Sequence, residues 1–351
     1  MLRSLLLYSL VSLVFSEMSG ASEVSGVQLS LWSEATPYSA LSKQLPEFKK
    51  LKLALNVAVH ESEVIPEDFF RFYAAAQKAG VEVRPWLLLE KSHGYWLCKW
   101  NVDVFEKFVR KFVSAMHSHG LQLDLLIFDI EPPAELMHRL EKADHSKDFR
   151  KMLEILRHSS EDGSILTSQR RLRSFVESLQ KDGLRVQAVT TPLVLHDFSD
   201  HDHKMKIQSA LGVPIQGIPW NNISFMVYRQ EYIRMLGDIG ADVVYQYGKL
   251  AKKYFSAGVS LALGEVGAAV FPDVFTGYTR SEQLQIDLEA GEAAGISRFQ
   301  IYSLEGLASL KGQSIGPWLQ VPTARIPSFD VKTRLLILVL DILASFLPAG
   351  S

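Results

Sequence analysis

Glycine residues that close helical stretches just before apolar runs constrain the fold of this chain more than any other feature. In five places a helical pattern ends on glycine, and a continuous or alternating apolar segment follows at once. Glycine suits the left-handed position that ends a helix, because it has no Cβ atom to clash there. The five glycines are Gly80, Gly120, Gly183, Gly258 and Gly295. The pattern predicts repeated junctions from a helix to a strand.

Apolar runs of strand length bring the number of predicted strands to eight. They are Val27–Trp32, Leu51–Val59, Val81–Leu89, Leu121–Ile130, Leu184–Leu195, Ile223–Tyr228, Val259–Gly264 and Ile296–Ser303. Near-continuous apolar strands that alternate with amphipathic helices are typical of a parallel sheet covered on both faces. Eight units in a chain of 351 residues predict an α/β fold, a single (β/α)8 TIM barrel.

Two details complete the predicted architecture. Segments 134–165 and 196–222 are longer than a barrel loop needs, so we expect extended loops after strands four and five, lining the substrate groove. An open doubly wound sheet is the alternative fold. No Gly-x-Gly-x-x-Gly or Walker A pattern follows the first strand, which removes the main nucleotide-binding reason to prefer that alternative.

The first 25 residues have the pattern of an export signal. Arg3 precedes a short apolar run, Leu5 to Phe15, and a small polar segment follows. The run is too short to cross a bilayer, which takes about 20 apolar residues. We therefore expect residues 1–25 to be a signal peptide or apolar export segment and residues 26–351 to be the catalytic barrel. The expected location is secreted, periplasmic or the cell envelope.

Charge and cysteine content narrow the partners and the sources of stability. A formal net charge of -2 gives no broad attraction to nucleic acid, so no nucleic-acid partner is expected. Cys98 is the only cysteine, so no internal disulfide can form. The apolar stretch Leu335 to Leu347 is interrupted by Asp341 and is also too short to span, which predicts a buried last helix and no stable membrane span.

The most specific candidate for chemistry is the end of the fourth predicted strand. Asp129 and Glu131 follow a strongly apolar run and precede two prolines. Residues two apart on a strand point the same way, and neighbouring carboxylates raise one another's pKa, which a general acid near neutral pH requires. The alternative is that the two acids only cap a helix or begin a surface loop.

This strand resembles the fourth strand of glycoside hydrolase family 18, the chitinase-like barrels, which ends in Asp-x-x-Asp-x-Asp-x-Glu. Asp124, Asp129 and Glu131 match the motif in place, while Ile127 replaces its second aspartate. The resemblance continues at Phe225–Tyr228, which is similar to the family's Met-x-Tyr, and at Gln300–Leu304, where the family usually has tryptophan.

The resemblance implies roles for several of these residues. Glu131 would be the proton donor, Asp129 would orient the N-acetyl group of the substrate as an internal nucleophile, and Tyr228 would hold that group. Arg229 stands where the family usually has aspartate. The resemblance thus implies a glycoside hydrolase-like enzyme acting on an extracellular or cell-wall polysaccharide with N-acetyl groups.

A second mechanism rests on Glu265 at the end of the seventh predicted strand. Retaining glycosidases of the clan that includes cellulases and β-galactosidases place an acid/base at strand four and a nucleophile at strand seven, and Glu131 and Glu265 are similar to that pair. That clan usually has asparagine just before the strand-four glutamate, where this chain has Ile130. Glu265 as a structural anchor that pairs with Arg229 is the alternative.

Aromatic residues near the strand ends suit a carbohydrate partner, because sugar rings pack their C–H faces on aromatic planes. The predicted substrate-binding residues are Trp32, Trp86, Tyr95, Trp96, Trp220, Met226, Arg229 and Tyr302. A non-catalytic glycan-binding barrel remains the alternative from another class, since a fold alone does not decide function.

Metal and cofactor chemistry have weak support. The segment from His196 to His203 collects histidine and aspartate, but no second motif of fixed spacing accompanies it and no His-Glu-x-x-His occurs. We interpret it as a solvated, substrate-facing loop and expect no metal and no cofactor.

Overall fold

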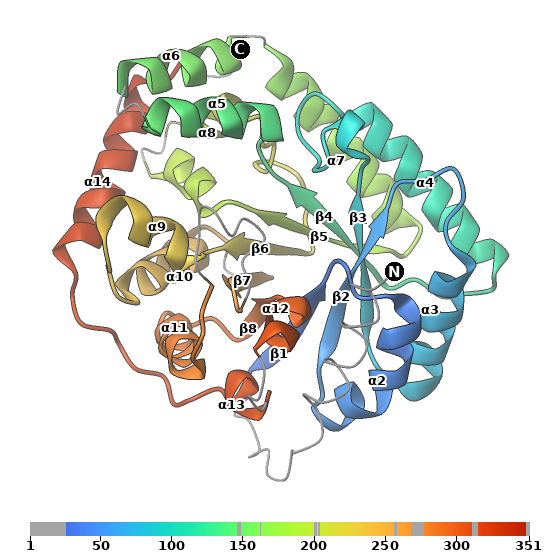
Figure 1. Ribbon diagram of the computed structural model, residues 1–351. Coiled ribbons are helices and arrows are strands. Elements are labelled where there is room, and N and C mark those ends of the chain that lie inside the picture. The colour runs from blue at the N-terminus through green and yellow to red at the C-terminus, as the bar shows by residue number, and fades with distance from the viewer. Residues whose placement is uncertain are drawn as a thin grey trace. The chain divides into compact units, whose positions relative to one another are not determined.

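The structure is a computed structural model that describes residues 26–145, 149–161, 163–199, 202, 204–255, 258–267, 277–310 and 315–348. Its eight strands form one closed barrel in chain order (Figure 1). The strands are β1 Gln28–Ser33, β2 Ala54–His60, β3 Val83–Leu88, β4 Leu125–Ile130, β5 Arg185–Thr190, β6 Asn222–Met226, β7 Val259–Gly264 and β8 Arg298–Tyr302. The predicted (β/α)8 barrel is confirmed. The predicted export segment, residues 1–25, lies outside the described residues.

Helices connect and follow these strands. They are α2 Tyr38–Lys50, α3 Glu67–Ala79, α4 Val102–Ser118, α5 Ala134–His145, α6 Phe149–Ser160, α7 Ser164–Lys181, α8 Lys206–Leu211, α9 Arg229–Leu236, α10 Asp242–Tyr254, α11 Ser281–Ala293, α12 Leu304–Ser309, α13 Gly316–Leu319 and α14 Val331–Phe346. Two short 3-10 helices, η1 Lys91–His93 and η2 Pro192–Phe198, follow β3 and β5.

The five glycines of the sequence pattern all adopt left-handed backbone conformations. Their φ angles range from 65° at Gly120 to 88° at Gly295. An L-residue with a side chain rarely adopts these angles, which is why glycine stands at each junction. The predicted fifth strand was too long: β5 ends at Thr190, and Pro192 begins η2. Proline lacks the N–H that a central strand needs, so the apolar run changes structure there.

The chain divides into two compact units, which are described separately below. Unit 1 comprises the residues up to Ala58, Pro66–Pro85 and Phe225–Thr333. Unit 2 comprises Val59–Ile65, Trp86–Ser224 and the residues from Arg334 onward. Unit 1 contains the paired strands β1 and β2, and β8 pairs with both β1 and β7. Unit 2 contains the full pairing of β4 with β5.

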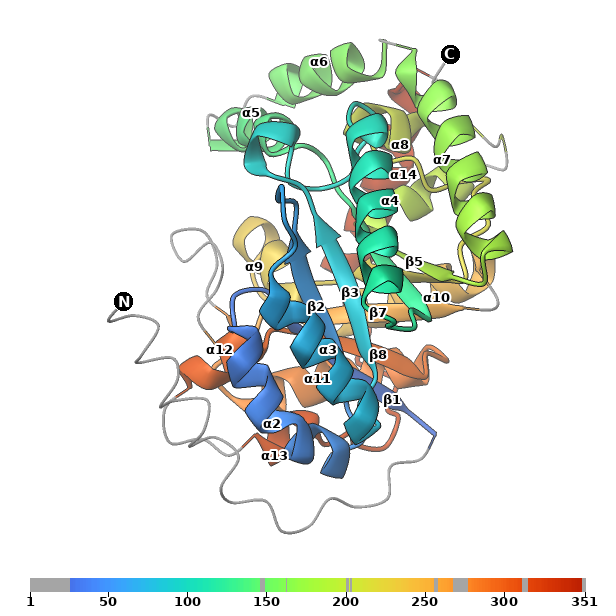
Figure 2. The same ribbon diagram turned by 90° about the vertical axis from the view of Figure 1, so that its right-hand side faces the viewer.

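Aromatic side chains fill the layer between strand and helices in unit 2. The ring of Phe128 on β4 lies 4.8 Å from that of Phe105 on α4 and 6.1 Å from that of Phe175 on α7. Helices α4 and α7 run side by side over this strand (Figure 2). Phe128 therefore faces the helices, and the next residue along the strand, Asp129, faces the other way.

The segments after β4 and β5 are helical rather than open loops. Helices α5, α6 and α8 with η2 pack on one another in unit 2. The buried side chain of Lys99 ties two of these segments together, because Nζ donates to the carbonyl oxygens of Ser159 and Ser209. The added chain length of both segments therefore builds a packed helical cap.

The last helix corrects a prediction. Helix α14 was expected to be buried, but several of its large apolar side chains, Leu335 and Phe346 among them, are exposed. The protein covers one face of this helix, where Thr333 and Ala344 are buried. Within the described residues, no helix is both long and apolar enough to cross a membrane.

Candidate functional site

Two carboxyl side chains stand at the end of β4, and they differ in exposure. Asp129 is buried, and its Oδ2 accepts a hydrogen bond of 3.0 Å from the indole Nε1 of Trp86. Glu131, two residues further on, is half-buried. Glu131 is therefore the acid of the pair that a ligand from solvent can reach. Asp124, the first acid of the motif, is exposed just before the strand begins, at its opposite end.

A loop segment extends the pairing of β4 and fixes the backbone of both acids. Leu97 forms a parallel bridge with Ile130. Its N–H donates to the carbonyl oxygen of Asp129 at 2.9 Å, and its own carbonyl accepts from the N–H of Glu131 at 3.1 Å. Glu131 is thus held at a strand edge rather than on a loose loop.

Asn101 in turn organises the loop that carries Leu97. Its Oδ1 accepts from the N–H of Cys98 at 2.8 Å, and its Nδ2 donates to the carbonyl oxygens of His93 and Trp96 at 2.9 and 2.8 Å. Asn101 is buried, so these three bonds are shielded from water. One side chain therefore supports the whole segment beside β4.

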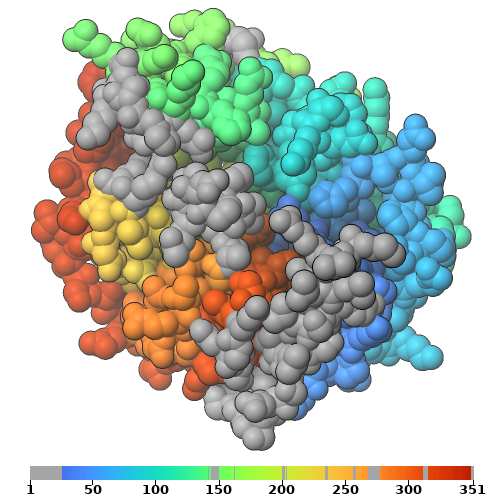
Figure 3. Space-filling model, in the orientation of Figure 1, coloured from blue at the N-terminus to red at the C-terminus, as the bar shows by residue number. Residues whose placement is uncertain are grey.

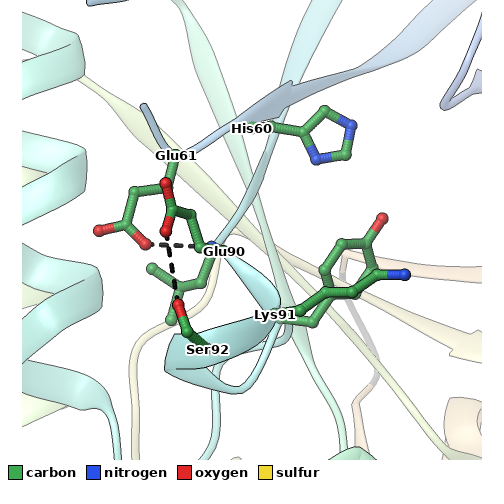
Figure 4. Close-up of a pocket in the computed structure, with 7 residues that line it drawn as sticks. His60, Glu61, Glu90, Lys91 and Ser92 are labelled. Atoms are coloured by element: carbon green, nitrogen blue, oxygen red, sulfur yellow. Dashed lines mark hydrogen bonds between the residues drawn. The ribbon is translucent and has the colours of Figure 1, made fainter. Parts of the chain in front are cut away.

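A cavity of about 550 Å³ lies at the ends of β2 and β3 in unit 2. Its lining residues are His60, Glu61, Leu89, Glu90, Lys91, Ser92 and Tyr95. Figure 4 shows the carboxyl groups of Glu61 and Glu90 side by side, with Ser92 next to Glu90. The mixture of two acids, a cation and an aromatic ring suits a ligand with many hydroxyl groups.

The acids of this cavity are partly engaged by the loop itself. Oε2 of Glu61 accepts from the N–H of Glu90 at 3.0 Å and pairs with Nδ1 of His93 at 2.8 Å. The hydrogen bond that His93 donates to Glu61 raises the pKa of His93 above its ordinary value. Oε2 of Glu90 accepts a long 3.4 Å bond from Ser92. Glu90 is thus the better placed of the two acids to receive a ligand hydroxyl.

Tyr95 adopts a left-handed backbone conformation, with φ of 66°. This region is unusual for a bulky residue, and such residues cluster at functional loops. Its ring lies 6.1 Å from that of His60 and 5.3 Å from that of Trp96. Tyr95 and Trp96 are both half-buried, so each residue keeps part of its surface open to solvent.

In unit 1, the ends of β1 and β8 bring a tyrosine and a glutamate together. The hydroxyl of Tyr302 donates to Oε2 of Glu34 at 2.5 Å, and the rings of Tyr302 and Tyr228 lie 6.1 Å apart. Burial, followed by the charge of Glu34, raises the pKa of Tyr302 far above its usual range. Tyr302 therefore stays a hydrogen-bond donor at every physiological pH.

The loop that carries Glu34 is fixed by Glu305. Five donors from residues 33–36 reach its Oε1, among them the hydroxyl of Thr36 at 2.7 Å and the N–H of Glu34 at 3.0 Å. Glu305 therefore has a structural task at the end of β1.

Glu265 follows β7 and has a second glutamate in its surroundings. Burial, followed by the charge of Glu265, raises the pKa of Glu231 to about 8. Glu231 lies in the first turn of α9, and although its carboxyl group is desolvated, the residue as a whole is exposed. The charge of Glu265 therefore opposes ionisation of Glu231.

Arg229 is a correction to the predicted substrate-binding set. It is buried, and its guanidinium binds Oδ1 of Asp287 at 2.9 Å and Oδ1 of Asp238 at 3.3 Å. It also lies over the ring of Tyr278. Arg229 pairs with these aspartates rather than with Glu265, because its position at the start of α9 directs it toward α11.

Three tryptophans are corrections as well. Trp32 and Trp86 are buried and offer no open face to a sugar ring. Trp220 precedes β6 and so lies at the amino end of that strand, where its ring packs on Phe128 and its Nε1 donates to the carbonyl of Ile215 at 3.0 Å. Tyr95, Trp96, Met226 and Tyr302 keep partial exposure, and their binding role stays a prediction.

The histidine and aspartate segment after β5 begins with two residues that are not solvated, which is a further correction. His196 and Asp197 are both buried. Nδ1 of His196 lies 2.7 Å from Oδ1 of Asp341, and the carboxylate of Asp197 accepts the N–H groups of Ile207 and Gln208 at the start of α8. His201 and His203 lie outside the described residues. Across the described part of the chain, no cluster of three or more potential metal ligands occurs.

Sequence reasoning missed Glu231, Glu61, Lys91 and Ser92. Each stands two or three residues beyond the end of a strand that the sequence pattern predicted. A search one helical turn past each predicted strand could have found them, but nothing in the sequence shows that Glu231 and Glu265 lie near one another.

The likeness of this chain to known proteins lies in its fold. No protein-family model matches the sequence, and no curated protein matches it. The solved structure of GH5_18 from Bifidobacterium longum subsp. longum ATCC 55813 is similar, with a TM-score of 0.50 and 11% identity over 85% of this chain and 81% of that chain.

Two further solved structures have lower scores. GH5_18 from Streptomyces cattleya, in complex with Manb1-4GlcNAc, has a TM-score of 0.48 and 12% identity over 92% of this chain and 82% of that one. The catalytic domain of a hyperthermophilic chitinase from Pyrococcus furiosus has 0.43 and 12%, over 93% and 98%. At such identities the likeness shows the barrel fold alone.

Proposed function

We propose that this chain is a glycoside hydrolase-like enzyme that cleaves an extracellular or cell-wall polysaccharide, with Glu131 as the proton donor. The observation that supports it is the placement of Glu131: half-buried at the carboxyl end of β4 and fixed by Leu97. The carboxyl ends of barrel strands are where such folds place catalytic groups. A glutamic acid held there can protonate the glycosidic oxygen as the bond to the sugar breaks.

Asp129 would assist from the interior. The indole of Trp86 fixes its carboxylate, so Asp129 has a set orientation before any ligand arrives. The resemblance to family 18 assigns this residue to the N-acetyl group of the substrate, whose oxygen then attacks the sugar carbon. An N-acetylated glycan is therefore the proposed substrate.

The cavity at the ends of β2 and β3 would hold a sugar unit of the same glycan. Its volume of about 550 Å³ lies within the range of small-ligand sites, roughly 300–1,000 Å³. The loop segment Tyr95–Leu97 joins this cavity to the end of β4, because Tyr95 lines the cavity and Leu97 pairs with Ile130. The ring of Tyr95 offers an apolar plane, and Glu90 offers an acceptor for hydroxyl groups.

The test is the release of reducing ends from chitin oligomers, peptidoglycan and other polysaccharides. Loss of a general acid typically slows turnover by about 10²–10⁴-fold, so we expect Glu131→Gln to reduce release by that factor. Glu135→Gln, at an exposed position in the first turn of α5, is the matched control and should retain turnover. Unchanged release in Glu131→Gln would refute the assignment.

A second mechanism, with Glu265 as a covalent nucleophile, is favoured by one observation. The charge of Glu265 helps to raise the pKa of Glu231 to about 8, so the carboxylate that this mechanism would use as a nucleophile has a second acid close to it. Under this mechanism, Glu265→Gln abolishes cleavage of glycans with or without N-acetyl groups. Under the first mechanism, cleavage requires the N-acetyl group, and Glu265→Gln keeps measurable turnover.

A binding-only barrel gives a third outcome in the same assay. Retention on a glycan without release of reducing ends over long incubation, in the wild-type protein and in Glu131→Gln alike, would assign the chain to glycan recognition. Retention that depends on Tyr95 and Glu90 would then locate the binding site at the cavity.

A further inference from the structure

Helix α14 presents a row of large apolar side chains to solvent. Six side chains of this helix are 41–68% exposed: Val331, Leu335, Leu338, Val339, Ile342 and Phe346. Apart from the adjacent Leu338 and Val339, successive members are three or four residues apart, which places the row on one side of the helix. Together they leave on the order of 500 Å² of apolar surface open, near the upper end of the largest patch on an ordinary monomer, about 300–600 Å².

The opposite side of α14 is fixed to the protein. Oδ1 of Asp341 lies 2.7 Å from Nδ1 of His196, whose side chain has no exposed surface. Ala344 and Leu347 are also buried. The helix therefore stays docked, and the apolar row is available to a partner without any rearrangement.

Positive charge accompanies the apolar row. Helix α6 lies at the carboxyl end of α14 (Figure 1), and Nη2 of its Arg157 donates to the carbonyl of Phe346 at 3.5 Å. Arg150 and Lys151 of α6 are exposed as well, and the sequence of α6 contains a single acid, Glu154. Arg334 adds another exposed cation on α14 itself.

The positive charges near the apolar row favour one kind of partner over another. A second copy of the chain would bring the same cations of α6 and α14 toward each other, which costs free energy through like-charge repulsion. An anionic lipid surface attracts them, and its acyl chains accept the apolar side chains. Figure 3 shows red atoms of α14 at the surface.

We propose that α14 is a lipid-binding helix that lies in the headgroup region of an anionic bilayer. The row from Val331 to Phe346 enters the boundary of the acyl chains, and the cations of α6 lie at the phosphates. With 16 residues the helix is about 24 Å long, and its Asp341 remains on the protein side. Membrane contact along the surface, rather than crossing, follows from this geometry.

The first test compares two isoleucines of nearly equal exposure, Ile342 on α14 at 47% and Ile286 on α11 at 48%. The full chain carrying Ile342→Asp or Ile286→Asp is sedimented with vesicles of phosphatidylcholine, with and without phosphatidylglycerol. We expect Ile342→Asp to weaken binding to the anionic vesicles by about tenfold, the worth of one buried apolar side chain. Ile286→Asp should bind as wild type. Equal binding of the two variants would overturn the proposal.

The second test locates the helix directly. Cysteine replaces Ile342 or Ile286, and each is labelled with an environment-sensitive nitrobenzoxadiazole dye; the native Cys98 is buried. The emission of the label at position 342 should shift to shorter wavelength when anionic vesicles are added, and the label at position 286 should not respond. No shift at position 342, or a dimer in solution that Ile342→Asp abolishes, would overturn the proposal, and the dimer would assign the row to a second copy.

Discussion

Arg229 shows how one residue can be mistaken for part of a binding site. Its position after the sixth strand predicts a place on the ligand-binding face, but its guanidinium group forms ion pairs with aspartates of the protein itself. Burial raises the pKa of Asp287 to about 6, against the lowering effect of Arg229, and the hydroxyl of Tyr278 donates to Oδ2 of the same carboxylate. The three side chains satisfy one another, so each depends on the others.

Removal of Arg229 should therefore affect folding. We expect Arg229→Met to lower the free energy of unfolding by about 3–5 kcal/mol, because the buried Asp287 loses its cation and must either stay charged without it or take up a proton. The double variant with Asp287→Leu should recover most of the loss. Urea unfolding at pH 7 measures both. If the single variant has normal stability and a raised KM, Arg229 instead binds the substrate.

Glu231 makes the stability of the folded chain depend on pH in a defined direction. Its pKa in the folded protein is about 8, against an ordinary value of 4.5, with burial as the main cause and Glu265 as the second. Below about pH 4.5 both folded and unfolded chains hold the proton. Between pH 4.5 and 8 only the folded chain holds it, so this group's contribution to stability declines as pH rises and is lost above about 8.

Glu231→Gln should remove this decline. The measurement is the free energy of unfolding between pH 5 and 9. Relative to the wild type, the free energy of unfolding of the variant should increase as pH rises. Glu282→Gln, in the exposed first turn of α11, controls for the loss of a first-turn glutamate. Parallel curves for wild type and Glu231→Gln would contradict the prediction.

At the scale of elements, the loop from His93 to Asn101 links a supporting side chain to the candidate acid. Asn101 holds the loop through three hydrogen bonds, and the loop holds Glu131 through Leu97. We expect Asn101→Ala to cost about 2–4 kcal/mol of stability, at about 1 kcal/mol for each bond plus buried groups left unpaired. Turnover at saturating glycan should also fall, because Glu131 loses its fixed backbone.

Asn101→Asp separates the two effects. It keeps the acceptor for the N–H of Cys98 and loses both donors to the carbonyls of His93 and Trp96. An intermediate loss of stability together with reduced kcat and little change in KM is expected in unfolding and steady-state assays. Full kcat in a folded Asn101→Ala protein would show that the loop does not position the acid.

The helices and strands could be predicted from the sequence, because the signals that define them are local. A glycine such as Gly183 marks a helix end through its own backbone, and the apolar run after it marks a strand. The exposure of α14 could not be read, because an apolar pattern records hydrophobicity and not which surface covers it. The proximity of Glu231 to Glu265 depends on how α9 packs against β7, which the spacing along the chain does not encode.

At the scale of the whole molecule, the chain combines a predicted export signal with a single thiol. Burial raises the pKa of Cys98 to about 11. At pH 7 such a thiol is ionised to about one part in 10⁴, and the thiolate is the form that reacts with oxidants and disulfides. An oxidising compartment therefore gives this cysteine little opportunity to react while the protein stays folded.

Native protein should accordingly react with Ellman's reagent at least about 100-fold more slowly than the same protein in guanidinium, since both ionisation and access oppose the reaction. The melting temperature should be the same with and without a reductant, because one cysteine forms no internal disulfide. Fast labelling of the native chain would show that the segment around Cys98, which joins the candidate acid to Asn101, opens readily. If the segment opens readily, Asn101→Ala would change the labelling rate little. If the segment is closed, we expect Asn101→Ala to speed labelling in proportion to the stability that the variant loses.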